Sequence, residues 1–176
     1  MPKLHGGLAA LRKNRITILG ARYFVTCVTQ DRKKELDQVK IWEHLLQLIS
    51  KSEADIYAVV LMPDHLHLFF ELPKGSTLST IIRAIKGPMT PVMRSTGIRW
   101  QKNYFEHRLR ESEETEPYLR YMLSNPYRAQ LVEITEAWPY WAVTSESAEW
   151  FINKFPNQFP EPEWITVAAP WSEIKE

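Results

Sequence analysis

The sequence predicts a single α+β domain, a sandwich with the order β-α-β-β-α-β followed by one more helix and an irregular tail. The chain has 176 residues, which suffice for one buried core and are few for two. Segments with strand composition alternate with segments of helical periodicity, and a Pro-Asp turn joins the two middle strands. This order is that of ferredoxin-like folds with helices on one sheet face, so we expect the other face to be open.

The first half of the sandwich begins at Tyr23–Thr29, where β-branched and aromatic residues predict a strand. Apolar residues then recur near the helical period and predict a helix over about residues 35–52. Strands follow at Ile56–Met62 and His65–Leu72. The turn dipeptide Pro63-Asp64 between them predicts a hairpin.

The second half contains two helices and one strand. Thr77, or the serine before it, caps a helix that Pro88 and Pro91 must bend or end. A strand at about residues 104–110 and a helix at about residues 113–125 complete the order.

The composition excludes several protein classes. No apolar run approaches the roughly 18 residues of a membrane helix, and the N-terminus lacks the apolar core of a secretory signal. The only cysteine, Cys27, cannot form an internal disulfide or a zinc site of several thiolates, which fits a reducing cytoplasm. The absence of a Gly-rich phosphate loop, a GxSxG elbow and a CxxC pair disfavours ATP-driven and thiol chemistry.

The net charge of +1 is unevenly distributed along the chain. Residues 1–110 hold 18 basic and 9 acidic residues, a balance of +9, and the rest of the chain has a balance of −8. A basic body indicates a polyanionic partner such as nucleic acid, although two solvated faces without a partner also explain the pattern. We predict a basic arm over residues 1–22, a central domain over 23–137 and an acidic Trp/Pro-rich extension over 138–176. The extension either covers the basic surface or completes the core.

Two histidines in the second predicted hairpin strand are candidate metal ligands. Side chains alternate along a strand, so His65 and His67 lie on one face while Leu66 and Leu68 face the helices. Both imidazoles can then reach one divalent ion, for which a third ligand is needed. The alternative is a pair of exposed or hydrogen-bonded histidines.

The last predicted helix offers that third ligand and a nucleophile. Tyr121 and Asn125 are four residues apart and share one helix face. Pro126 predicts that the helix ends at Asn125, with the amide near its tip. A tyrosine beside a metal-bound phosphate is a candidate nucleophile, whereas the alternative is an ordinary packing residue.

Three ordered motifs combine these residues: Pro63–His67, Trp100–Arg110 and Tyr118–Ala129. Together they resemble the single-tyrosine HUH transposases, and most closely the REP-associated tyrosine transposases, over about residues 23–141. The resemblance implies a ferredoxin-like catalytic domain, single-stranded DNA with a hairpin such as a REP-like palindrome as substrate, and Mg²⁺ or Mn²⁺ as cofactor. It also implies a cytoplasmic, nucleoid-associated protein that acts as a monomer or a homodimer.

Carried over by position, the resemblance implies a role for each candidate. His65, His67 and Asn125 are the metal ligands, and Tyr121 is the nucleophile that forms a 5′-phosphotyrosine and leaves a free 3′-hydroxyl. Rejoining then needs no ATP. For His107, strand alternation predicts a buried, hydrogen-bonded side chain, and the resemblance leaves a supporting active-site role open.

Basic residues in the arm, on the second helix and near the site are candidate DNA contacts, or else ordinary surface charge. They are Arg12, Lys13, Arg15, Arg22, Arg83, Lys86, Arg108, Arg110 and Arg120. The rival to a transposase is a catalytically silent ferredoxin-like regulator that binds nucleic acid. An RNA-recognition domain is disfavoured because the chain lacks the aromatic and glycine pattern of its signature strand.

Overall fold

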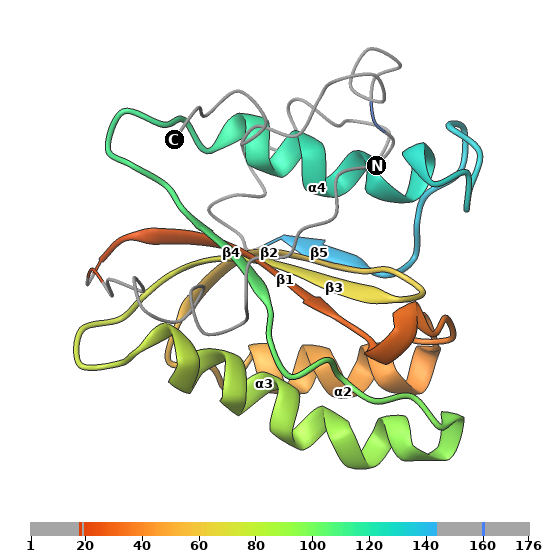
Figure 1. Cartoon of the computed structure of the whole chain (residues 1–176). Helices are drawn as coiled ribbons and strands as arrows, with labels where there is room; N and C mark the ends of the chain where they lie inside the picture. Colours follow the sequence, from red (N-terminus) through yellow and green to blue (C-terminus); the bar gives the residue numbers. More distant parts are fainter. Residues whose placement is uncertain (1–17, 19, 144–159, 161–176) are drawn as a thin grey trace.

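The computed structural model describes residues 18, 20–143 and 160 of the chain. These residues form one antiparallel sheet with the strand order β4-β1-β3-β2-β5 (Figure 1). The strands are β1 (Arg22–Val28), β2 (Asp55–Leu61), β3 (His65–Glu71), β4 (Phe105–Arg108) and β5 (Trp141–Val143). The helices are α2 (Val39–Ile49), α3 (Leu78–Met93) and α4 (Glu116–Arg128), with short 3-10 turns η1 (Gln30–Arg32) and η2 (Arg94–Thr96). The predicted ferredoxin-like order is confirmed.

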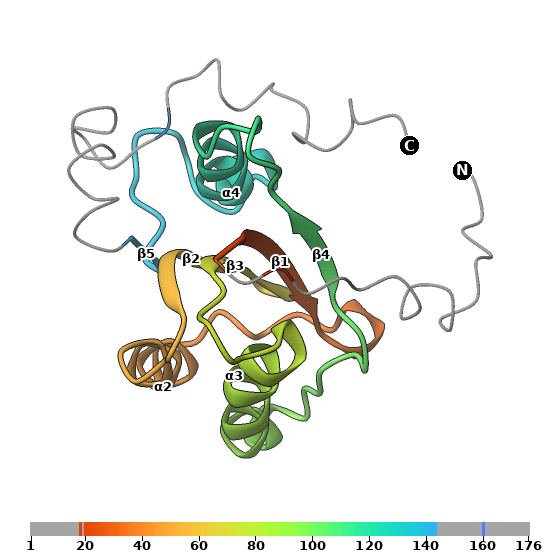
Figure 2. The same cartoon turned by 90° about the vertical axis from the view of Figure 1, so that its left-hand side faces the viewer.

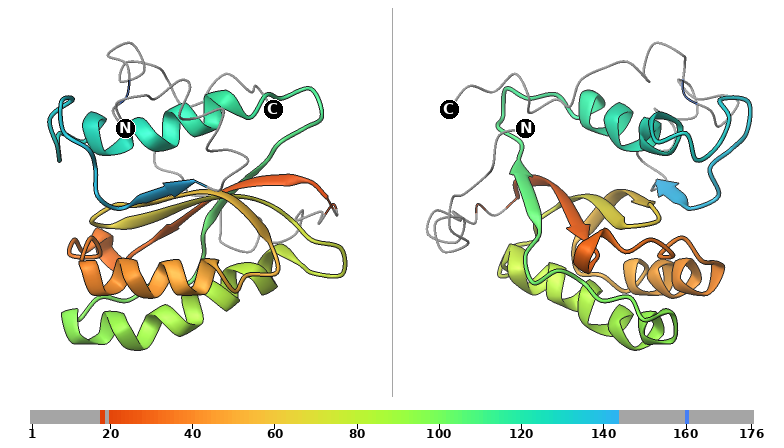
Figure 3. Two further views of the ribbon diagram at one scale, coloured as in Figure 1. Left: turned by 180° about the vertical axis from the view of Figure 1, so that it is seen from behind. Right: turned by 45° about the vertical axis from the view of Figure 1, so that its right-hand side comes forward.

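One face of the sheet packs on α2 and α3, as the strand alternation predicts. Leu66, Leu68 and Phe70 of β3 are fully buried there, together with Ile81 and Ile85 of α3. In both views of Figure 3, α2 and α3 lie together below the sheet. This layer is the larger hydrophobic core of the described residues.

The opposite face of the sheet is covered by α4, so the prediction of an open face is wrong (Figures 1 and 3). Phe24 and Phe69 on this face are fully buried against Leu119 and Met122 of α4. The reason is that this face also carries large apolar side chains, and burying them contributes roughly 25 cal/mol per Å². As a result His67 is only 3% exposed.

Three prolines that were predicted to end or bend a helix lie inside helices. α3 runs through Pro88 and Pro91, and α4 runs through Pro126 to Arg128. A proline removes one helical N–H donor, but the turn after Pro126 still closes, because the Ala129 N–H donates to the Asn125 carbonyl at 2.9 Å. The predicted helix end at Asn125 is therefore wrong, and Asn125 remains on the helix one turn after Tyr121.

The segment that was expected to be an irregular extension begins with a strand. β5 pairs antiparallel with β2, with Ala58 opposite Val143 and Val60 opposite Trp141. Trp138 is 6% exposed, and its indole N–H donates to the Leu61 carbonyl at 3.0 Å. The acidic part of the tail lies outside the described residues, apart from residue 160, as do Arg12, Lys13 and Arg15 of the arm.

We expect Trp138→Ala to lower the free energy of unfolding by about 3–5 kcal/mol, because it removes a large buried ring from the α4 layer. Trp138→Phe keeps most of that volume and leaves the Leu61 carbonyl without its donor, so a loss of about 1–3 kcal/mol is expected. Urea unfolding followed by circular dichroism measures both. Equal, small losses for the two variants would show that Trp138 does not complete this layer.

In the described residues, none of the helices combines the length and the hydropathy that are needed to cross a bilayer.

Candidate active site

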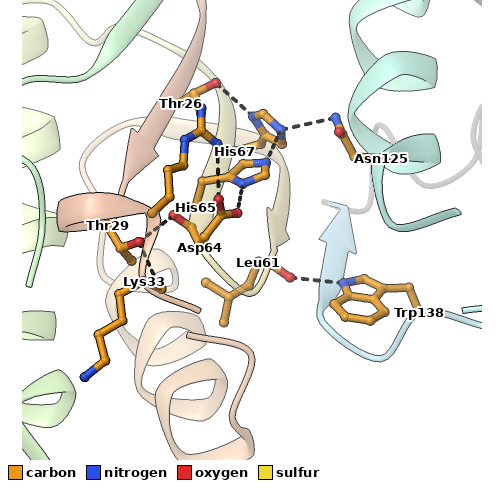
Figure 4. Close-up of polar contacts among 10 residues, drawn as sticks. Thr26, Thr29, Lys33, Leu61, Asp64, His65, His67, Asn125 and Trp138 are labelled. Carbon is orange, nitrogen blue, oxygen red and sulfur yellow. Dashed lines mark hydrogen bonds and ion pairs between the residues drawn. The ribbon is translucent and has the colours of Figure 1, made fainter. Parts of the chain in front are cut away.

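The two predicted ligand histidines meet on the α4 side of the sheet, at the start of β3 (Figure 4). The Nε2 atoms of His65 and His67 are 3.1 Å apart, and their rings are nearly perpendicular, with an interplanar angle of 79°. Strand alternation places them on one face, where α4 contacts His67, which is buried, while His65 is partly buried. The structure therefore brings both nitrogens to a single point.

The other ring nitrogens have partners of their own. His65 Nδ1 lies 2.5 Å from Asp64 Oδ1, and His67 Nδ1 lies 2.9 Å from the hydroxyl of Thr26, which faces it on β1 (Figure 4). A proton on each Nδ1 satisfies both contacts and leaves a lone pair on each Nε2. Burial, reinforced by the neighbouring His65, lowers the pKa of His67 well below its usual range, so this ring is neutral.

Asp64 is held as a carboxylate. Its hydrogen bond to His65 lowers its pKa to about 2 despite partial burial, and Arg32 adds an ion pair at 3.2 Å. Because this pKa lies below that of an unfolded aspartate, the contact stabilises the fold at neutral pH, and this stabilisation is lost as the pH falls from about 4 toward 2. Arg32 is placed by η1, where both Asp31 and Arg32 have positive φ angles.

The side-chain amide of Asn125 reaches the histidine pair from α4. Its Nδ2 lies 3.2 Å from His67 Nε2 and also donates to the Tyr121 carbonyl at 3.2 Å. Rotation of the amide by half a turn places the oxygen toward the imidazoles instead. Two imidazole nitrogens and an amide oxygen are a donor set that fits a divalent ion. Within the described ranges no three His, Cys, Asp or Glu side chains lie close enough together to hold a metal ion.

Tyr121 lies one turn before Asn125, beside the same histidine. Its ring centroid is 6.1 Å from that of His67 and 6.1 Å from that of Phe24, both in edge-on contact. The Arg128 guanidinium lies over the ring, 5.1 Å from its centroid. This is a cation–π contact, in which the guanidinium is attracted to the face of the ring.

The nearby Tyr118 has a different environment. It is 2% exposed, and its hydroxyl donates to Glu113 at 2.6 Å and lies 2.7 Å from His107 Nε2. Burial, together with the bond to Glu113, raises the pKa of Tyr118. His107 is thus partly buried and hydrogen-bonded, as predicted, and its printed contacts are with Tyr118 and Glu113 rather than with the histidine pair.

Sequence comparison now identifies the family. The family described as "Transposase IS200 like" matches residues 17–125, more than half of the chain, and the match includes both histidines, Tyr121 and Asn125. This chain belongs to the IS200-like transposases. Members are enzymes that cleave DNA, so membership makes the chain a transposase.

Two curated relatives agree with this membership, and one solved structure shares the fold. The IS200-like chain is 27% identical over 130 residues to a REP-associated tyrosine transposase of Escherichia coli, covering 72% of this chain and 78% of the relative. It is 29% identical over 139 residues to a Haemophilus influenzae relative named for the same group, covering 69% and 78%. A REP-associated tyrosine transposase bound to a REP hairpin shares the fold, with a TM-score of 0.64, 24% identity and 88% of each chain covered.

The predicted DNA-contact residues that fall within the described part of this IS200-like transposase do not gather around the histidines. Arg22, Arg108 and Arg110 line a cleft of about 600 Å³ near the start of β1. Arg22 also donates to Thr115, and Arg120 pairs with Glu116 on α4. Arg83 and Lys86 line a different cleft, beside α3.

Four side chains of the site were not among the predicted site residues: Thr26, Arg32, Asp64 and Arg128. Thr26 faces His67 only because β1 pairs with β3 in this register, and Arg32 reaches Asp64 only through η1. Neither contact leaves a signal in the sequence. The position of Arg128 was visible, since it lies seven residues after Tyr121, near two helical turns.

Proposed function

We propose that this transposase cleaves and rejoins single-stranded DNA that carries a hairpin, with a divalent metal ion and with Tyr121 as the nucleophile. The observation that carries the proposal is the convergence of the His65 and His67 Nε2 atoms, the Asn125 amide and the Tyr121 ring. The relative that was solved with a REP hairpin supports a hairpin substrate. Such a substrate fits a cytoplasmic, nucleoid-associated protein that acts as a monomer or a homodimer.

His65, His67 and Asn125 would hold the ion. When bound, a divalent ion supplies Lewis-acid polarisation of the scissile phosphate. Asp64 and Thr26 keep the two Nε2 lone pairs directed at the ion by accepting the Nδ1 protons. Mg²⁺ and Mn²⁺ both suit the proposal, and the imidazole ligands favour Mn²⁺.

Tyr121 would attack the scissile phosphorus through its phenolic oxygen. The phenol loses its proton, the new bond joins phosphorus to the tyrosine oxygen, and the bond to the 3′-oxygen breaks. That oxygen takes up a proton and becomes a free 3′-hydroxyl. Because the phosphodiester energy is retained in the phosphotyrosine, rejoining needs no ATP.

The experiment that tests the proposal is incubation of the full chain with 5′-flank-labelled and 3′-flank-labelled hairpin oligonucleotides and Mn²⁺, followed by denaturing electrophoresis. We expect a covalent adduct that retains only the label on the 3′ side of the cut, because a 5′-phosphotyrosine keeps that fragment. A panel of hairpins with unpaired flanks serves as substrate, and the same strands without the palindrome serve as controls. Binding without an adduct across the panel would favour the catalytically silent regulator.

We expect Asp64→Asn to weaken Mn²⁺ binding by about 10- to 100-fold, because the amide accepts the His65 Nδ1 proton less strongly and holds the ring less well. Paramagnetic resonance titration of free Mn²⁺ measures the affinity without DNA. Asp55→Asn makes the same chemical change at an exposed position of β2 and serves as the control. Equal affinities for Asp64→Asn and the unmodified chain would contradict the positioning role of Asp64.

A further inference from the structure

A second cleft is lined by α3 and by the segment that leads into β4. Figure 2 shows α3 and this segment on the side of the sheet away from α4. Its volume is about 760 Å³. Three cationic side chains and two aromatic ones contribute to its walls: Arg83, Lys86, Lys102, Trp100 and Tyr104. No acidic side chain is among the described residues that line it. The cleft therefore presents positive charge and ring surface together.

Lys86 carries its charge here without an acidic partner. Its Nζ donates to the Gln101 carbonyl at 2.7 Å and lies 5.8 Å from the centroid of the Trp100 ring. Across the described part of the chain no carboxylate pairs with it. Partial burial lowers the pKa of Lys86, because holding a charged ammonium among neutral groups costs free energy. An anion that enters the cleft would offset this cost.

The aromatic rings narrow down which anion fits. Tyr104 is half-buried, and its hydroxyl lies 3.3 Å from the Ser79 hydroxyl of α3. A basic groove that binds only duplex phosphates needs no rings, whereas rings beside cations are typical of sites for unpaired nucleotides, since every base has a face that stacks. The chemistry of the cleft thus fits one phosphate and one unpaired base.

Backbone hydrogen bonds connect this cleft to the histidine pair. The Gln101 N–H donates to the Val28 carbonyl at 2.8 Å, and Val28 faces His65 across β1 and β3. Gln101 and His65 are therefore separated by about two strand spacings, roughly 10 Å. This span is the length of a few nucleotides at most, because even in the compact B-form a strand rises about 3.4 Å per nucleotide. A strand that leaves the histidines would have to pass around the sheet near residues 99–104 to reach the cleft, because the cleft lies on the other side of the sheet.

We propose that the α3 cleft binds one unpaired nucleotide of the DNA strand whose scissile phosphate lies at His65 and His67, a few nucleotides away. Lys86 and Arg83 hold the phosphate, and Tyr104 stacks on the base. This inference rests on the proposed function for the path of the strand. It makes the cleft a second point at which the enzyme holds unpaired DNA.

The test of stacking is an abasic scan. The probe is a fluorescein-labelled hairpin with unpaired flanks, in which one flank nucleotide at a time lacks its base, and fluorescence anisotropy gives the affinity. Binding is measured in a Tyr121→Phe background so that covalent capture does not interfere. We expect one position near the cut to lose about tenfold in affinity. That loss should disappear in Tyr104→Leu, which removes the ring, and persist in Tyr104→Phe, which keeps it.

The test of the phosphate contact compares two arginines. Arg83→Gln should weaken binding and reduce the slope of log affinity against log salt by about one. Arg94→Gln removes the same charge at an exposed position outside the cleft, just after α3, and should change both less. Both variants are compared at temperatures where circular dichroism shows full folding.

The outcomes separate this inference from the proposed function. A flat abasic scan, a scan unchanged by Tyr104→Leu, or equal effects of Arg83→Gln and Arg94→Gln would overturn the nucleotide site even where the wild-type chain forms its adduct. If millimolar deoxynucleoside monophosphate displaced the labelled hairpin completely, the cleft would be a site for free nucleotides, and the inference would also be overturned. A position-specific loss in the scan, combined with a wild-type chain that forms no adduct, would support the site and contradict the cleavage chemistry.

Discussion

Tyr121→Phe is expected to abolish the covalent adduct and cleavage while DNA affinity changes little. The substitution removes only the attacking oxygen, and removal of a covalent nucleophile typically costs on the order of 10⁶-fold in rate. The remaining ring keeps its contacts with Phe24, His67 and Arg128, so the site stays packed. Denaturing electrophoresis with labelled hairpin DNA measures the adduct, and anisotropy measures affinity.

Two neighbouring tyrosines provide matched controls. Tyr118→Phe and Tyr127→Phe should both retain the adduct, because each hydroxyl is already held inside the fold. Tyr118 donates to Glu113. Tyr127 donates to the Glu136 carbonyl at 3.0 Å and accepts a hydrogen bond from the backbone N–H of Trp138 at 3.2 Å. Both variants should be less stable and are assayed below their melting temperatures. An adduct that persists in Tyr121→Phe and disappears in Tyr118→Phe would move the nucleophile to Tyr118.

The second large effect is expected for the histidine pair. Replacing His65 and His67 together by alanine should eliminate cleavage and bring specific Mn²⁺ binding below detection, because it removes both imidazole donors of the set. Cleavage by the unmodified chain should need a divalent ion, with Mn²⁺ well tolerated, and should cease in excess EDTA. Rate measurements and Mn²⁺ titration by paramagnetic resonance together distinguish loss of metal from loss of fold.

His44→Ala is the control for this pair. His44 lies on α2, against the Pro88 carbonyl at 3.1 Å, on the other side of the sheet. It should leave metal binding and cleavage unchanged. Full cleavage in EDTA, or Mn²⁺ affinity that survives the double substitution, would contradict the metal proposal.

Several parts of the fold and the candidate site could be predicted because they depend on neighbours in the chain. The two-residue period of a strand is local, so the sequence was enough to place His65 and His67 on one side of the predicted strand and Leu66 on the other. The helical period likewise places Tyr121 and Asn125 on one face. The Pro63-Asp64 turn predicted the hairpin that β2 and β3 form. Each of these inferences uses only residues that are close in sequence.

Other expectations were wrong where segments that are distant in the sequence pack against each other. The predicted open face is closed because Phe24 and Phe69 leave apolar area that α4 buries. That burial also helps hold α4 together through Pro126, although the residue before a proline is biased away from helix. A local preference of a few kcal/mol at most was outweighed by packing that involves residues almost a hundred positions apart.

The sequence by itself determined the strand and helix order, the pairing of His65 with His67 on one face and of Tyr121 with Asn125 on another, and the resemblance to a transposase family. Only the tertiary structure decided that these two faces meet. It also decided that Thr26 and Asp64 turn both Nε2 atoms to one point, and that Gln101 connects the α3 cleft to the same end of the sheet. The physical reason is that side-chain direction follows from local backbone geometry, whereas the choice of which faces meet depends on the apolar area that the whole chain can bury.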